Sequence, residues 1–197
     1  MHLYLIRHGE TVIGPDKLYP DGAGLTLRGQ AQARAVASAL RERGVDLIVT
    51  SGLRRTYETA RPLTRALGLS PVAMPGLNEI YAGRLRDAPI ETIQEIADSG
   101  WKPDFKRFGG EDMGDFGRRI AESSRCLLDT AASKGAETVA AFVHGGTITV
   151  MLEQVKGQPF SGQRFDYVPN CSISLVCANG TGTEIRYKFD TNHLADV

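Results

Sequence analysis

Short apolar runs that favour β-strands alternate with helical patterns along nearly the whole chain. The expected strands cover residues 1–6, 45–50, 71–74 and 139–143, and the expected helices cover 26–43, 52–68, 112–134 and 147–155. This order predicts an α/β fold with three layers, in which a mostly parallel sheet has helices on both faces. Two further strands at 171–177 and 184–189 predict a hairpin, so one edge strand is expected to be antiparallel. We interpret residues 1–197 as a single domain.

Some local features of the helices are also predicted. The expected buried face of helix 26–43 consists of Leu27, Ala31, Ala35 and Ala39, with Val36 and Leu40 beside it. Ser51 is the expected N-cap of the next helix. Pro62 lies inside that helix and is expected to kink or split it. The region 75–111 is less regular, with one helix expected near 89–97.

Two of the expected strands end in the same dipeptide. Arg7-His8-Gly9 follows the first strand, and His144-Gly145 follows the strand 139–143. Because ligands of open α/β sheets bind at the carboxyl ends of the strands, the two imidazoles are expected to face one site. The alternative for each histidine is a cap on backbone groups. Two histidines in matched contexts, one beside an arginine, favour a shared site.

Groups suited to an anion follow the other strand ends. Arg54 and Arg55 come after the strand 45–50, Glu79 comes after 71–74, and the helix opened by Gly145 offers free N–H groups. An arginine fork matches phosphate oxygens, imidazole can act as a nucleophile, and a carboxyl group of raised pKa can protonate a leaving group. A P-loop lysine and paired magnesium-binding aspartates are missing from the sequence. The set predicts metal-free phosphoryl transfer through a histidine, without a cofactor.

The charge balance narrows the classes of partner. The chain has 23 Lys and Arg and 23 Asp and Glu residues, which argues against nucleic acid or a membrane surface as partner. No apolar run approaches the ~20 residues of a membrane span, and no signal peptide is visible. Cys126, Cys171 and Cys177 lack metal-ligand spacing and are typical of a reducing compartment. We expect a cytoplasmic protein whose partner is a small phosphomonoester; a homodimer stays an open alternative.

The motif Arg7-His8-Gly9-Glu10 resembles the signature of the histidine phosphatase superfamily, which includes the cofactor-dependent phosphoglycerate mutases. The resemblance continues in order along nearly the whole chain, through the segments 25–31, 51–60, 77–83, 109–111 and 143–146. One Arg-His-Gly is a weak match by itself. Six segments in the right order are a specific one.

The resemblance implies a role for each matching residue. His8 would attack phosphorus and become phosphohistidine. Arg7, Arg55 and His144 would hold the phosphoryl oxygens. Glu79 would protonate the leaving oxygen and then help to activate water.

Other residues have weaker assignments. Gly145 and Thr11 are expected near the substrate phosphate, although capping the loop is an equal alternative for Thr11. Arg84, Arg86 and Trp101 are left open as substrate contacts. Exposed loop charges and core packing are the alternatives for these three.

The chain departs from the mutases of the superfamily at three places. Ile80 stands where mutases carry an arginine beside the acid, Val12-Ile13 stands where they carry Trp-Asn, and the segment from Glu79 to Glu111 is short. A mutase must protect phosphohistidine from water, so all three departures favour hydrolysis. The expected function is a phosphomonoester hydrolase acting on a small phosphorylated metabolite. A phosphoglycerate mutase and a non-catalytic phosphate-binding or scaffold protein are the alternatives.

Overall fold

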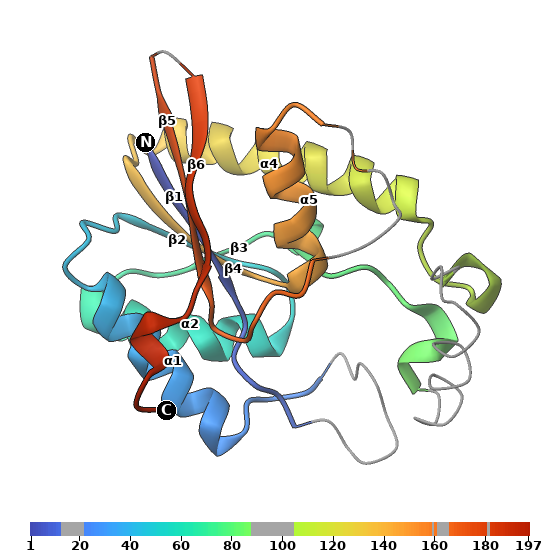
Figure 1. Cartoon of the computed structure of the whole chain (residues 1–197), viewed down its shortest axis with the longest axis horizontal. Coiled ribbons are helices and arrows are strands. Elements are labelled where there is room, and N and C mark those ends of the chain that lie inside the picture. The colour runs from blue at the N-terminus through green and yellow to red at the C-terminus, as the bar shows by residue number, and fades with distance from the viewer. Residues whose placement is uncertain (13–21, 88–104, 159, 161–165, 181) are drawn as a thin grey trace.

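The structure is a computed structural model that describes residues 1–12, 22–87, 105–158, 160, 166–180 and 182–197. Within these residues one six-stranded sheet lies between two pairs of helices (Figure 1). Helices α1 (Leu27–Leu40) and α2 (Arg54–Leu67) cover one face of the sheet. Helices α4 (Met113–Ser133) and α5 (Gly145–Val155) cover the other face. The three-layer α/β fold predicted from the sequence is confirmed.

The sheet is parallel except on one side. Its strands follow in the order β3 (Val72–Ala73), β2 (Leu47–Thr50), β4 (Thr138–Val143), β1 (His2–Arg7), β5 (Ile173–Asn179) and β6 (Gly182–Asp190). The first four pair in parallel, whereas β5 runs antiparallel to both of its neighbours. The predicted C-terminal hairpin and the antiparallel pairing at one side of the sheet are therefore confirmed.

Strand β1 shows why the sheet needs both layers of helices. Its side chains alternate between two buried clusters, with Tyr4 and Ile6 packed toward α1 and α2, and Leu3 and Leu5 toward α4 and α5. A strand that is apolar on both faces is typical of a parallel sheet covered on both sides. The apolar run at the start of the sequence therefore fixes β1 in the centre of the molecule, and the residues after it at the sheet's carboxyl edge.

The predicted buried face of α1 is correct at Val36 and Leu40 and wrong at Leu27. Leu27 is 84% exposed, and the buried residues are Gly29, Gln32, Ala33, Val36, Ala37 and Leu40. Alanines occur on all sides of this helix, so its apolar periodicity is weak and the tertiary contacts decide its orientation. Gly29 packs against the backbone of Glu10, and the Gln32 Oε1 accepts a hydrogen bond of 2.9 Å from the Glu10 amide. The helix thereby supports the loop that follows β1.

Helix α2 begins differently from the prediction. Its N-cap is Leu53, without a side-chain hydrogen bond, and the Ser51 hydroxyl instead lies 3.0 Å from the Thr56 hydroxyl. The helix is not split at Pro62 but continues as one element to Leu67. Pro62 has no N–H to donate to the Glu58 carbonyl, but the helix continues past it.

The chain between β3 and α4 consists of short turns where it is described. They are the 3-10 helices η1 (Pro75–Leu77), η2 (Gly83–Asp87) and η3 (Phe105–Phe108). A small apolar cluster of Ala82, Leu85 and Phe105 joins η2 to η3. The helix expected near 89–97 lies outside the described residues. A last short turn, η4 (Asn192–Leu194), follows β6.

Candidate active site

The two sequence-predicted histidines are neighbours because their strands are neighbours. Arg7 is paired with Val143 in the parallel register of β1 and β4, and the His8 amide continues the pairing with a 3.0 Å bond to the Val143 carbonyl. His8 and His144 therefore leave the sheet side by side, and their ring centroids are 5.3 Å apart. The prediction that two imidazoles share the carboxyl edge of the sheet is confirmed.

His8 presents one ring nitrogen as a free base. Its Nδ1 lies 2.8 Å from the Gly9 carbonyl, and because a carbonyl can only accept, Nδ1 carries the proton and Nε2 keeps its lone pair. His8 is 8% exposed, and burial, followed by the charges of Arg55 and Arg7, lowers its pKa to about 3. The ring is therefore neutral, and its Nε2 is available as a nucleophile over the physiological pH range.

The backbone around His8 is held from several elements. The Gly9 amide donates to the Thr59 hydroxyl at 2.9 Å, and the Asn170 side chain donates to the His8 carbonyl at 3.0 Å. A Cβ built on Gly9 would lie 2.7 Å from the Gly29 carbonyl oxygen, and one built on Gly29 would overlap the Glu10 carbonyl. The loop after β1 thus lies directly on the first turn of α1.

His144 is fully buried and has partners on both ring nitrogens. The Arg55 Nε donates to its Nδ1 at 3.3 Å, so the proton of the neutral ring is on Nε2, which lies 2.8 Å from the Ser51 hydroxyl. Burial, followed by the positive charge of Arg55, lowers its pKa well below 6.5. His144 is therefore a neutral hydrogen-bond donor beside His8.

The two predicted arginines surround the histidines with positive charge. Arg55 is buried at the first turn of α2. Arg7 donates from Nη1 to the Val168 carbonyl, while its Nε is buried without an acceptor among the described residues. A Cβ built on Gly145 would lie 3.8 Å from this Nε, which places it next to the start of α5. A buried N–H of a guanidinium group without a partner is suited to an anionic ligand.

Glu79 lies at the same helix start. Its Oε2 accepts a 2.9 Å bond from the Gly146 amide, and its Oε1 accepts a 3.0 Å bond from the Ile80 amide. Burial raises the pKa of Glu79 above its usual value, although these bonds and the charges of Arg55 and Arg7 act in the opposite direction. The carboxyl group is thus suited to act as a proton donor.

A comparison with protein families shows to which family the chain belongs. Residues 3–191 match the family described as "Histidine phosphatase superfamily (branch 1)". The chain belongs to this superfamily.

Relatives with different assigned activities resemble the chain along its length. It is 31% identical to "Probable phosphoglycerate mutase GpmB" of Yersinia enterocolitica, over 98% of this chain and 95% of that protein. It is 27% identical to a structure titled as a putative alpha-ribazole-5'-P phosphatase from Escherichia coli, with a TM-score of 0.79 and coverage of 95% and 96%. A mycobacterial glucosyl-3-phosphoglycerate phosphatase, 23% identical, has a TM-score of 0.78 with coverage of 96% and 99%, which shows the shared fold.

The other residues considered from the sequence lie in different surroundings. Thr11 forms an isolated antiparallel bridge with Leu25, which fits the alternative of a loop contact. Arg84 and Arg86 lie in η2, and the Arg86 guanidinium lies 5.4 Å from the ring centroid of Tyr81. Trp101 lies outside the described residues. For this superfamily member, contacts of these residues with substrate stay untested.

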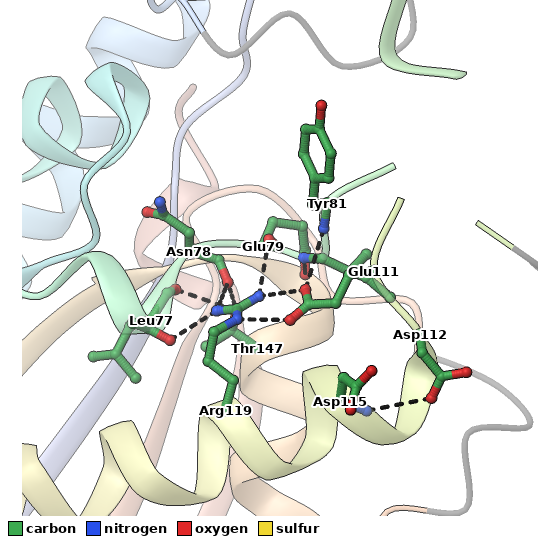
Figure 2. A network of polar contacts seen from close by, with 11 residues as sticks. Leu77, Asn78, Glu79, Tyr81, Glu111, Asp112, Asp115, Arg119 and Thr147 are labelled. Carbon is green, nitrogen blue, oxygen red and sulfur yellow. Dashed lines mark hydrogen bonds and ion pairs between the residues drawn. The ribbon is translucent and has the colours of Figure 1, made fainter. Parts of the chain in front are cut away.

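Sequence reasoning missed three residues that hold the site together. Ser51 was interpreted as a helix cap, whereas its hydroxyl binds His144. Arg119 and Glu111 form an ion pair of 2.6 Å that binds the backbone on both sides of Glu79 (Figure 2). The Gly109-Gly110-Glu111 motif was the one available signal, since Arg119 follows another arginine on an amphipathic helix and resembles a surface charge.

Two expected absences remain predictions. Among the described residues, no three His, Cys, Asp or Glu residues are grouped so that they could hold a metal ion. In the same part of the chain, no helix is both long and apolar enough to cross a membrane.

Proposed function

We propose that this protein hydrolyses small phosphomonoesters through a phosphohistidine formed on His8. The observation that carries the proposal is the unprotonated Nε2 of His8 beside the neutral His144, within the field of two guanidinium groups. A role limited to binding would not require this nucleophile, nor a carboxyl group of raised pKa at Glu79.

The first step transfers the phosphoryl group to the protein. The lone pair on the His8 Nε2 attacks phosphorus, and the bond from phosphorus to the ester oxygen breaks. Glu79 gives its proton to that oxygen, so the product leaves as an alcohol. Arg7 and Arg55 stabilise the charge on the transferred phosphoryl oxygens. The His144 Nε2–H donates to the Ser51 hydroxyl and would bind a phosphoryl oxygen only by exchanging that partner.

The second step returns the protein to its first state. Water attacks phosphorus and gives a proton to the Glu79 carboxylate, while the electron pair of the P–N bond returns to the His8 Nε2. Inorganic phosphate leaves, and Glu79 is protonated for the next cycle. After both steps His8 is again unmodified and Glu79 is again protonated, so the cycle needs no reactant besides the ester and water.

Ile80 supports hydrolysis over phosphoglycerate mutation. Its side chain packs against the apolar residues around Ala82 and Leu85 and also against the main core. An apolar residue there supplies no cation for the carboxylate of a phosphoglycerate, which the arginine of mutases would bind. The resemblance to the Escherichia coli structure titled as a phosphatase agrees with this choice.

Mutase activity is the second candidate, because the curated relative at 31% identity is named a probable phosphoglycerate mutase. The deciding experiment compares phosphate release from a panel of phosphomonoesters with isomerisation of 3-phosphoglycerate primed by bisphosphoglycerate. We expect hydrolysis of at least one monoester to exceed isomerisation and to persist in excess chelator. Isomerisation far above every hydrolytic rate would reject the proposal, and activity lost to chelator and restored by a metal would reject the metal-free mechanism.

A further inference from the structure

The segment that carries Glu79 has little regular secondary structure to hold it. After η1 ends at Leu77, residues 78–82 form neither helix nor strand. Their carbonyl groups therefore have no regular ladder of partners, and side chains from other elements must bind them. The position of the Glu79 carboxyl group depends on these side chains.

Arg119 of α4 binds carbonyls in and just before this segment, and the Thr147 hydroxyl also lies 3.4 Å from the Asn78 carbonyl. Its Nη1 donates to the carbonyls of Gly76 and Asn78 at 2.7 and 2.9 Å, and its Nη2 lies 3.4 Å from the Glu79 carbonyl. Figure 2 shows the guanidinium group pointing from the helix into this turn of backbone. One planar group thus fixes three carbonyls within four residues, because its N–H groups form a rigid fork.

Glu111 fixes the arginine and the other side of the segment. Its carboxylate accepts from the Arg119 Nε and Nη2 at 2.8 and 2.6 Å, and its Oε2 also lies 3.3 Å from the Tyr81 amide. The Glu111 amide donates to the Tyr81 carbonyl at 2.7 Å. The Arg119 and Glu111 side chains are only 28% and 16% exposed, so solvent screens this pair less than a surface ion pair.

We propose that Arg119 and Glu111 are positioning residues for proton transfer by Glu79, an assignment that rests on the proposed phosphatase function. Neither side chain touches the Glu79 carboxyl group, which is bound by the Gly146 and Ile80 amides. The pair acts on the backbone before and after Glu79 and thereby keeps the carboxyl group at the start of α5. The effect is geometric, so the shape of the guanidinium group matters and its charge alone does not suffice.

The packing of helix α4 on the sheet does not depend on the ion pair between Arg119 and Glu111. It is anchored by the fully buried side chains of Phe116, Ile120 and Leu127. Replacing Arg119 should therefore leave the helix packed and release only the segment 76–81. Arg118 offers a matched control, because it is the preceding residue of the same helix, pairs with Asp115, and is 71% exposed.

The kinetic experiment compares Arg119→Lys with Arg118→Lys on two substrates. Arg119→Lys keeps the charge and removes the fork. We expect the rate of the first step, measured as the burst of alcohol release, to fall about 10–100-fold for an alkyl phosphate, as displacement of a reacting group by roughly 1 Å does. With para-nitrophenyl phosphate, whose leaving group needs no proton, the loss in the burst rate should stay within about threefold. Added to Glu79→Gln, Arg119→Lys should cause no further loss on the alkyl substrate. Arg118→Lys should match the wild-type protein throughout.

A second measurement separates this inference from the proposed function. The carboxyl ¹³C resonance of Glu79, identified by its loss in Glu79→Gln, reports the pKa directly and requires no turnover. Since burial is the main cause of the raised pKa, we expect the pKa to move toward its usual value in Arg119→Lys and in Glu111→Gln, and to stay raised in Arg118→Lys. An unchanged pKa in both variants, or an equal loss on both substrates, would overturn the positioning role. An inactive wild-type protein in which the pKa still responds would overturn only the phosphatase function.

Discussion

His8 and His144 lie at the ends of neighbouring parallel strands, whereas Glu79 lies on a segment outside both sheet and helices. On the histidine side, the backbone ladder between β1 and β4 fixes the distance between the rings. On the acid side, the segment around Glu79 has no strand beside it. The side chains of Arg119 and Glu111 bind its backbone instead.

This difference separates two parts of the reaction. In the proposed mechanism, the sheet edge binds and attacks the phosphoryl group, which all phosphomonoesters share. The segment around Glu79 serves the departure of the alcohol, the part of the first step in which substrates differ. Changes on the histidine side should therefore affect the first step with every substrate, and changes on the acid side should affect that step according to the leaving group.

The largest effect is expected for His8→Asn. The asparagine amide can still donate to the Gly9 carbonyl, but the nucleophilic lone pair is lost, so activity should fall by more than roughly 10³-fold on every substrate. Acid-labile phosphate trapped during turnover should map to His8 in the wild-type protein and be missing in the variant. Labelling that persists in His8→Asn would show that the nucleophile lies elsewhere.

Glu79→Gln should distinguish between substrates. A general acid contributes typically ~10²–10⁴-fold when the leaving alcohol is a poor one, so the first step, measured as the burst of alcohol release, should slow by about this much for alkyl phosphates and much less for para-nitrophenyl phosphate. Phosphohistidine should also accumulate, because the second step needs the same carboxylate. Equal losses on both substrates without a trapped intermediate would mean that Glu79 only shapes the pocket.

Arg55→Met should affect both substrates equally. The loss of one preorganised donor to a developing charge is expected to reduce kcat by about 10²–10³-fold, and His144 also loses its 3.3 Å bond from Arg55. Arg54→Met is the control, since Arg54 is exposed and pairs with Glu58 at 2.6 Å on the same turn. A loss for Arg55→Met that depended on the leaving group would show that phosphoryl binding at the sheet edge and proton transfer at Glu79 are not separate.

The buried state of His8 predicts a smaller effect, on stability. Its pKa is about 3 in the folded protein against 6.5 as its ordinary value, so between these pH values the unfolded chain binds more protons. The free energy of unfolding therefore decreases as the pH falls through this window. In His8→Asn this decrease should be shallower, by up to about 1 kcal/mol per pH unit. Denaturant unfolding from pH 7 to pH 4 measures both slopes, and identical slopes would contradict the buried neutral histidine.

The two sides also differ in how far the sequence predicts them. His8 and His144 follow apolar runs with clear strand patterns, so their meeting at one edge followed from the rule for parallel sheets. Arg55 and Glu79 were assigned through resemblance. The support from Arg119 could not be predicted, because a hydrogen bond from a side chain to a distant carbonyl leaves no periodic pattern in the sequence. The buried face of α1 was predicted only in part for a related reason, since its many alanines leave the exact orientation to tertiary contacts.

The close approach of Gly9 and Gly29 means that the position of His8 also depends on Gly29, a residue that has no side chain to take part in the reaction. Any side chain at position 29 would meet the Glu10 carbonyl and push the loop after β1 away from α1. In a library of all single substitutions selected for phosphatase activity, position 29 should therefore tolerate as little variation as position 9. A designer who transplants this reaction to another scaffold must accordingly copy the glycine of the supporting helix along with the nucleophile.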